Sequence, residues 1–329
     1  MWRHNVKCPK TLLTTTALAS LLTFCIIGGY VHIGRLSACV APSDDLVKDK
    51  RTCRQNTVTQ CHSDISMTRD TRYILYGEGL ADQQTTKRLH SYIRSLTSRQ
   101  TPGGVRLTDK SGQQHFSQIG ESQFVDKLLK GRRNGVFIEC GAADGEQLSN
   151  SLFFELHRNW TGILIEGNPQ FYEPLLAKNR NAYVVRACLS TTSKPQIVKY
   201  MLAHFGSGIY NKMHSSVVKD FHLENKPTID IHCFPLNSIT AALGIQQVDY
   251  LSLDVEGPEV DILSTIDWTQ LSVDVMTLEY GKKPYKLKQL RSLLTANGTF
   301  TEVALLPVGS NDNTGQDVVF MRTGVHPDG

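Results

Sequence analysis

Four acidic residues stand where short apolar runs of the sequence end. They are Glu139, Glu166, Asp254 and Glu279, and the run before each has the length and composition of a buried strand. In parallel α/β sheets, ligands bind outside the carboxyl ends of the strands, so these carboxylates are expected to lie near one site. Carboxylates there can accept hydrogen bonds from a ligand or take part in proton transfer.

The first of these runs leads into a turn rich in glycine. Residues 136–145 have the sequence Val-Phe-Ile-Glu-Cys-Gly-Ala-Ala-Asp-Gly, and a helical stretch is expected over 147–158. Gly141 and Gly145 lack a Cβ, so the backbone can turn tightly and approach a ligand closely. The helix brings free N–H groups and a partial positive charge to the same point. The pattern is typical of the strand, loop and helix that open a doubly wound nucleotide-binding sheet.

Glu166 is the most informative of the acidic residues. It ends the second predicted strand, 162–165, and precedes Asn168-Pro169, where a helix is expected to begin. A carboxylate at this place can accept hydrogen bonds from both hydroxyls of a ribose. The alternative is an ordinary acidic residue ahead of a helix N-terminus. The glycine turn upstream favours the ribose interpretation.

Polar residues around the turn have two possible roles. Glu139 and Asp144 could bind the ammonium group of a methionine moiety, directly or through water, or could cap the turn. Ser149 and Asn150 could bind the carboxylate of the same moiety, or could cap the following helix.

Candidate catalytic residues come from later in the chain. Asp254 and Glu256 lie on one side of a strand end, by the period of two, and could bind substrate, orient a base or hold a cation. No His–carboxylate cluster accompanies them, so no metal site is predicted. His204 and His214 fall between the third and fourth strands, where a substrate lid is expected. His204 is a candidate base, although unpaired loop histidines are commonly exposed.

Strands and helices must alternate to position these residues. Five strands are expected, followed by a closing pair that suggests an antiparallel hairpin, as in S-adenosylmethionine-dependent methyltransferases. The strands are expected at 136–138, 162–165, 182–189, 248–253, 273–278, 300–306 and 317–321. The predicted fold class is α/β, with a doubly wound and mostly parallel sheet.

The amino terminus predicts a membrane anchor. Residues 11–34 carry no formal charge and are rich in leucine and isoleucine, and basic residues precede them. At about 1.5 Å per residue, this run is long enough for a helix to cross a hydrocarbon core of about 30 Å. Basic residues stay in the cytosol, which predicts a type II protein with its body in the lumen or outside the cell. The alternative is a signal peptide cleaved near residues 38–41.

A lumenal body has consequences for its cysteines and asparagines. Two sequons place possible glycans on Asn159 and Asn297. Six of the eight cysteines lie beyond residue 34. Among these, Cys53 and Cys61 lie close together in a polar stretch and could pair, although connectivity cannot be read from the sequence. Cys140 and Cys188 are expected as buried thiols within strands.

Composition and segment boundaries complete the outline. The chain has 329 residues and a formal net charge of +4, without a basic run interleaved with aromatics, so nucleic acid is not an expected partner. We predict a cytosolic tail (1–10), a transmembrane signal anchor (11–34), a stem with a lead-in helix (35–100) and one α/β domain (101–325).

Several ordered motifs resemble a known family. Residues 136–145, 148–150, 160–166, 168–169 and 253–257 are similar to the FkbM-type methyltransferase domain, with the likeness covering about 117–322. This resemblance implies a seven-stranded sheet of order 3-2-1-4-5-7-6 and an S-adenosylmethionine pocket. Cys233-Phe-Pro-Leu-Asn237, the stretch 249–257 and the anchor resemble the Star-like type II membrane proteins of animals.

The resemblances support two hypotheses. One is a membrane-anchored O-methyltransferase that acts on a small-molecule or glycan hydroxyl in the secretory pathway. The other is a non-catalytic adaptor that helps membrane-bound growth-factor precursors, as protein cargo, move from the endoplasmic reticulum to the Golgi or endosomes. The resemblance also leaves gaps, because no acidic partner for adenine is evident near Cys188.

Overall fold

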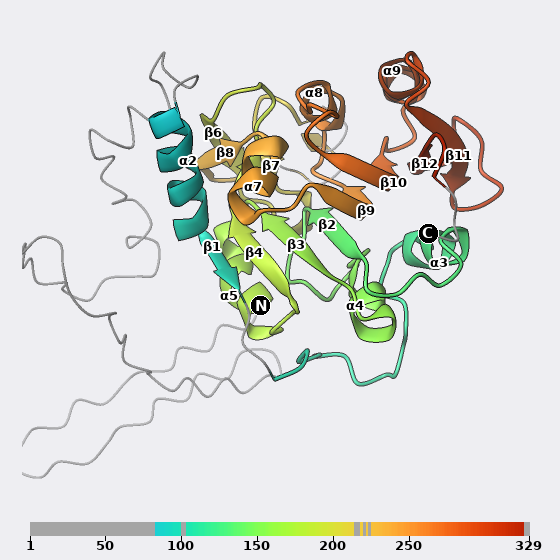
Figure 1. Cartoon of the computed structure of the whole chain (residues 1–329), viewed down its shortest axis with the longest axis horizontal. Helices are drawn as coiled ribbons and strands as arrows, with labels where there is room; N and C mark the ends of the chain where they lie inside the picture. Colours follow the sequence, from blue (N-terminus) through green and yellow to red (C-terminus); the bar gives the residue numbers. More distant parts are fainter. Residues whose placement is uncertain (1–82, 100–102, 214–217, 220–221, 223–224, 326–329) are drawn as a thin grey trace, which may run out of the picture. The chain divides into compact units, whose positions relative to one another are not determined.

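A computed structural model describes residues 83–99, 103–213, 218–219, 222 and 225–325, and all of these belong to one compact unit (Figure 1). Within these residues, no helix combines the length and the apolar character needed to cross a membrane. The predicted cytosolic tail and anchor, residues 35–82 of the predicted stem and lead-in segment (with Cys53 and Cys61), and His214 lie outside the described residues.

The larger sheet has eight strands in the order β1-β4-β3-β2-β9-β10-β12-β11. Strands β4 through β10 in this order run parallel, whereas β1, β12 and β11 pair antiparallel. Their bounds are β1 (Thr97–Arg99), β2 (Val136–Cys140), β3 (Thr161–Glu166), β4 (Ala182–Arg186), β9 (Gln247–Leu253), β10 (Ser272–Glu279), β11 (Phe300–Leu306) and β12 (Asp317–Arg322).

Without β1, the strands follow the expected order 3-2-1-4-5-7-6, and the closing antiparallel pair is present. The eighth strand is a correction. β1 comes from the segment predicted as stem and lead-in, and it pairs with β4 at the edge of the sheet.

Helices cover both faces of this sheet (Figure 1). Residues of α2, α7, α8 and α9 share one core with the sheet, and residues of α3, α4 and α5 share the other. Their bounds are α2 (Gln83–Ser95), α3 (Glu121–Leu128), α4 (Leu152–Arg158), α5 (Tyr172–Ala177), α7 (Leu236–Leu243), α8 (Glu259–Ser264) and α9 (Pro284–Thr295). Neighbouring strand residues face opposite ways. Phe137 therefore packs in one core and Ile138 in the other, which explains the continuous apolar runs.

A second sheet occupies the segment where a lid was expected. It has the order β5-β8-β6-β7, formed by β5 (Cys188–Leu189), β6 (Gln196–Met201), β7 (Gly208–Ile209) and β8 (Thr228–Phe234). The predicted third strand, 182–189, is therefore divided between two sheets. Residues 182–186 pair with β3, while 188–189 pair with β8.

A disulfide joins Cys188 to Cys233 within this smaller sheet. The two residues are direct partners in the parallel pairing of β5 with β8. The prediction of a buried free thiol at Cys188 was wrong, because periodicity carries no information on a partner 45 residues away. Cys140 is a buried free thiol, as predicted.

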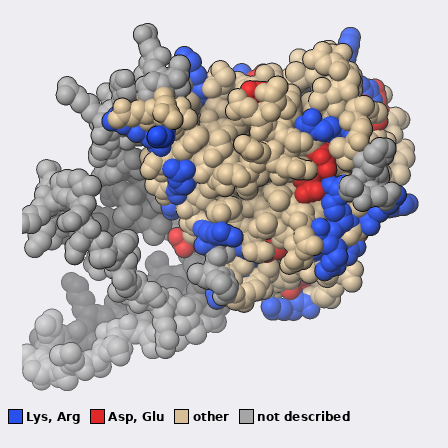
Figure 2. All heavy atoms as spheres, in the orientation of Figure 1, with Lys and Arg blue, Asp and Glu red and all other residues tan. Residues whose placement is uncertain are grey.

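Charged side chains on the face shown in Figure 2 form separate groups, with acidic side chains among the basic ones on its right side. Among the described residues, Arg132 contacts Asp249 at 2.6 Å and Asp274 at 2.7 Å, so its charge is paired. The expectation that nucleic acid is not a partner stays a prediction.

Loss of the disulfide is expected to lower the free energy of unfolding by about 2–5 kcal/mol, because the bond closes a long loop in the unfolded chain. The paired variant Cys188→Ser/Cys233→Ser tests this by chemical denaturation. Reductant is expected to destabilise the wild-type chain and leave the paired variant unchanged. Equal sensitivity of both proteins to reductant would contradict the assignment.

Gly141 is expected to tolerate no side chain. It has φ +85°, and a Cβ there would lie 1.9 Å from the backbone carbonyl oxygen of Asp254. Gly244 has a similar φ of +73° with no atom within 4 Å of such a Cβ, so it is a matched control. Gly244→Ala is expected to cost about 1–2 kcal/mol, from backbone strain alone. Gly141→Ala should lower the free energy of unfolding clearly more in the same denaturation experiment. Equal decreases for the two variants would show that the contact with the Asp254 carbonyl oxygen does not affect stability.

Candidate functional site

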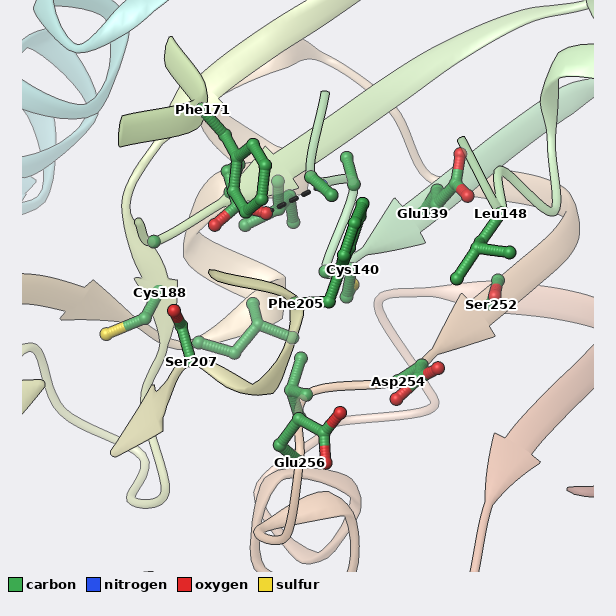
Figure 3. A pocket seen from close by; sticks show the side chains of 18 of the residues that line it. Glu139, Cys140, Leu148, Phe171, Cys188, Phe205, Ser207, Ser252, Asp254 and Glu256 are labelled. Carbon is green, nitrogen blue, oxygen red and sulfur yellow. Dashed lines mark hydrogen bonds between the residues drawn. The ribbon is translucent and has the colours of Figure 1, made fainter. Parts of the chain in front are cut away.

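A cavity of about 340 Å³ lies at the carboxyl ends of β2, β3 and β9, with residues of the smaller sheet on its other side (Figure 3). The predicted site residues that line it are Glu139, Gly141, Ser149, Asn150, Glu166, His204, Asp254 and Glu256. This is the place where ligands bind in open parallel sheets.

Glu166 is buried at the end of β3 and bound by the glycine turn. One carboxylate oxygen accepts the backbone N–H of Ala143 at 2.7 Å, and the other accepts that of Asn168 at 2.6 Å. Burial raises the pKa of Glu166 to about 7, against the lowering effect of these N–H groups. A carboxylate has about four acceptor positions, so two remain for ligand hydroxyls.

Glu139 organises the chain ahead of α4. It accepts hydrogen bonds from the Ser149 hydroxyl (2.9 Å), the Asn150 backbone N–H (2.6 Å) and the Ser151 hydroxyl (2.5 Å). These donors account for most of its acceptor capacity. A direct contact of Glu139 with an ammonium group stays a prediction.

Asn150 lines the cavity and has a buried polar atom without a hydrogen-bond partner in the described part of the chain. Its side chain is buried, and its Nδ2 donates to the Ser252 hydroxyl at 2.9 Å. Its Oδ1 is buried without a hydrogen-bond donor among the described residues. A buried acceptor left in this state costs about 1–3 kcal/mol, so a ligand donor at this point would bring a gain.

Asp144 and Gly145 do not line the cavity, so the geometry gives no support to a direct cofactor contact by either. Asp144 accepts the backbone N–H groups of Glu146 and Gln147, which is the capping alternative for this residue. The carbonyl oxygen of Gly145 accepts a hydrogen bond from the buried guanidinium of Arg180. Both residues stabilise the turn through contacts outside the cavity.

Asp254 and Glu256 lie along one side of the cavity (Figure 3). Burial and the nearby Glu279 carboxylate raise the pKa of Glu256 to about 8. Burial, then Glu279 and Glu256, also raise the pKa of Asp254 well above its ordinary value. Glu256 has φ +62°, a conformation that costs free energy in a residue with a side chain. Strain and a raised pKa together favour a role in proton transfer.

His204 lines the cavity from a short 3-10 helix, η2 (His204–Gly206). Its ring centroid lies 4.4 Å from that of Phe205 and 5.2 Å from that of Phe171 (η1, Pro169–Phe171), both with edge-on geometry. The side chain of His204 is nevertheless exposed, so these contacts place it at the solvent side of the cavity wall.

The sequence analysis did not identify the contribution of the smaller sheet. Tyr200 of β6 lines the cavity, and a Cβ on Gly167 would lie 2.9 Å from its ring. The Asn168 side chain donates to the Ser207 hydroxyl at 2.9 Å, which joins the segment before β7 to the loop after Glu166. The glycine directly after Glu166 was the available signal of a close neighbour.

The two sequon asparagines lie on the surface. Asn159 ends α4 with an exposed side chain, and Asn297 lies in the turn between α9 and β11, also exposed. Accessibility is necessary for glycosylation, and modification of either residue stays a prediction.

Residues 139–300 match the family described as the Methyltransferase FkbM domain. An FkbM methyltransferase domain is found here. The matched segment begins with Glu139, extends into β11 and contains most of the cavity. The match supports S-adenosylmethionine as the cofactor. The Glu166 carboxylate and the side-chain oxygen of Asn150 provide hydrogen-bond acceptors for it, and Gly141 leaves space beside them.

Comparisons with solved structures find many distant likenesses, and no curated protein matches. The FkbM methyltransferase of Methylobacillus flagellatus is 12% identical with a TM-score of 0.37, over 63% of this chain and 48% of that one. Aeropyrum pernix fibrillarin with bound S-adenosyl-L-methionine is 12% identical with a TM-score of 0.33, over 64% and 85%. A TehB-like S-adenosylmethionine-dependent methyltransferase from Corynebacterium glutamicum is 10% identical with a TM-score of 0.36, over 74% and 100%.

The raised pKa of Glu256 predicts a pH-dependent stability difference. Between pH 4.5 and about 8 the folded chain holds more protons than the unfolded chain, so its free energy of unfolding falls as pH rises. Glu256→Gln removes this loss. It is expected to match wild type near pH 4.5 and to exceed it by about 1–3 kcal/mol at pH 8.5. Urea denaturation at both pH values measures this, with the exposed Glu173→Gln as control. A pH-independent difference for Glu256→Gln would contradict the assignment.

Proposed function

We propose that this chain transfers a methyl group from S-adenosylmethionine to a hydroxyl group of a secretory-pathway substrate. The observation that carries the proposal is the coincidence of the FkbM match with the cavity that holds Glu166 and Glu256. One carboxylate is held by backbone N–H groups beside the glycine turn, and the other has a raised pKa on the acidic side of the cavity.

The division of work among the residues follows from their contacts. The cofactor, when bound, supplies an electrophilic methyl group on its sulfonium. Glu166 binds the ribose hydroxyls, and the side-chain amide oxygen Oδ1 of Asn150 accepts from the ammonium group, in place of the contact with the carboxylate expected from the sequence. Glu256 accepts the proton of the acceptor hydroxyl, and a pKa of about 8 suits this exchange near neutral pH. The rings of Phe171 and Phe205 give the cavity an apolar wall.

The acceptor is expected to be uncharged. Asp254, Glu256 and Glu139 place carboxyl groups along the cavity, and an anionic acceptor would be repelled by each of them that is ionised, as Glu256 must be when it accepts a proton. Hydroxyl groups can donate to these oxygens, which favours a glycan or a small polyol. Glycans and small polyols are therefore the two proposed classes of methyl acceptor.

We further propose a single-pass type II membrane protein whose domain lies in the lumen of the secretory pathway. The uncharged stretch at 11–34, the exposed sequon asparagines and the Cys188–Cys233 disulfide support this, since disulfides persist in oxidising compartments. The Star-like adaptor with protein cargo is the alternative, and no contact in the described residues favours it over catalysis.

Calorimetry of the full-length chain in detergent with S-adenosylmethionine tests the cofactor. The wild-type chain is expected to bind, and Glu166→Ala to weaken binding by about tenfold or more, because two charged hydrogen bonds are lost. Glu173→Ala, an exposed carboxylate on α5, is expected to bind as wild type does. A folded wild-type chain that fails to bind would refute the enzyme proposal.

Transfer of labelled methyl to a panel of glycans and polyols separates the enzyme from the adaptor. Turnover that rises with pH through about 8, and loses this dependence in Glu256→Gln, is the expected result. Cofactor binding without any transfer, together with a loss of precursor export on removal of the protein from cells, would favour the adaptor.

A further inference from the structure

Three carboxylates converge beside the cavity, on the side of Asp254. Ligand oxygens of Asp254, Glu259 and Glu279 all lie within 4.8 Å of one another, at the end of β9, the start of α8 and the end of β10. Glu259 is fully buried. Oxygen donors at such spacing are the ligand set of a hard divalent cation, and without a cation they repel one another.

A positive charge of the chain itself already lies among them. Lys286 of α9 is buried, and its Nζ is 2.5 Å from Glu259 Oε2 and 3.3 Å from Glu279 Oε2. Burial lowers the pKa of Lys286, but Glu259 and Glu279 outweigh this and raise it above its ordinary value. The side chain therefore stays an ammonium ion, and it contacts two of the three carboxylates.

The other oxygen of Glu259 holds the loop that carries Glu256. Glu259 Oε1 accepts the backbone N–H groups of Val255 and Gly257, both at 3.1 Å. Glu256 lies between these two amides in its left-handed conformation. The next residue is also confined, because a Cβ on Gly257 would lie 2.5 Å from the Lys212 carbonyl oxygen.

We propose that Lys286 is an internal cation that occupies the place of a metal ion among these carboxylates and, through Glu259, positions Glu256 at the cavity. Lys286 and Glu259 are positioning residues, because they reach the cavity only through the loop 255–257. The wild-type chain needs no divalent ion at this point. Removal of the ammonium group frees the loop and leaves a carboxylate cluster that accepts a divalent cation.

The inference rests on the proposed function only for the catalytic role of Glu256. Its test requires no methyl transfer, so its failure and the failure of the enzyme proposal are separate results.

Hydrogen exchange of the full-length chain, followed by mass spectrometry, measures a peptide that covers residues 254–258 in the presence and absence of Mn²⁺. The exchangeable amides of this stretch are those of residues 254–257, because residue 258 is proline. The variant is Lys286→Met, which keeps the length of the side chain and removes its charge. The matched control is Lys288→Met, an exposed lysine two residues along the same helix. A peptide covering β4 reports on global opening.

In Lys286→Met, exchange at 254–258 is expected to be about tenfold faster or more, since the loop loses its fixed acceptor, while the β4 peptide is unchanged. Mn²⁺ should restore slow exchange in this variant alone, as an external cation replaces the ammonium group. Unchanged exchange at 254–258, or equal acceleration in the β4 peptide, would overturn the proposal.

The wild-type chain provides an independent test if Lys286→Met does not fold. Mn²⁺ is expected to leave wild-type exchange at 254–258 unchanged, as in Lys288→Met. Slower exchange in wild type on addition of Mn²⁺, abolished by Glu279→Gln, would show that the cluster takes an external cation. That result would refute the role of Lys286.

Discussion

The contact between the backbones of the β2 and β9 loops is the constraint on which the site depends. Gly141 turns directly against the carbonyl oxygen of Asp254, where no side chain fits. The Asp254 N–H in turn donates to the Cys140 carbonyl at 3.2 Å. On its other side, the Gly141 N–H donates to the Ile165 carbonyl at 3.0 Å. One glycine therefore joins the ends of three strands and brings the glycine turn, Glu166 and the acidic loop to one cavity.

The carboxyl groups of this region fall into two groups, which differ in whether cationic and hydrogen-bond donors or other carboxyl groups lie next to them. Glu139 accepts N–H and O–H donors on its two oxygens, whereas Glu259 accepts N–H groups on one oxygen and forms an ion pair with Lys286 through the other, and both residues hold loops in place. Asp254 and Glu256 are half-buried at the cavity, and desolvation together with other carboxylates nearby raises the pKa of each. Burial of a charge is tolerated when donors surround it, and otherwise it favours the protonated form. Acidic residues therefore serve in two ways here: some hold the loops around the cavity in place, and Glu256 is the candidate base.

The smaller sheet gives the cavity its second wall. It is joined to the larger sheet by the short segment between β4 and β5, and the Cys188–Cys233 disulfide fixes β5 against β8 at that point. Tyr200 and Ser207 then contact the loop after Glu166. The cofactor side of the cavity therefore depends on residues far apart in the chain.

The sequence by itself determined the alternation of strands and helices, the glycine turn and the carboxylates at the strand ends, because these depend on local apolar runs and on residues without a Cβ. The order of the strands followed only from the resemblance to the FkbM-type domain. Only the tertiary structure decided which carboxylates accept hydrogen bonds from N–H and O–H groups of the chain. Asp144 and Glu139 look alike in sequence, yet Asp144 caps the turn from behind and Glu139 lines the cavity. The role of Lys286 was equally hidden, since it is set by a contact 27 residues away with Glu259 and not by any local pattern. Burial and pairing depend on what the folded chain brings near, and a linear pattern carries no such distances.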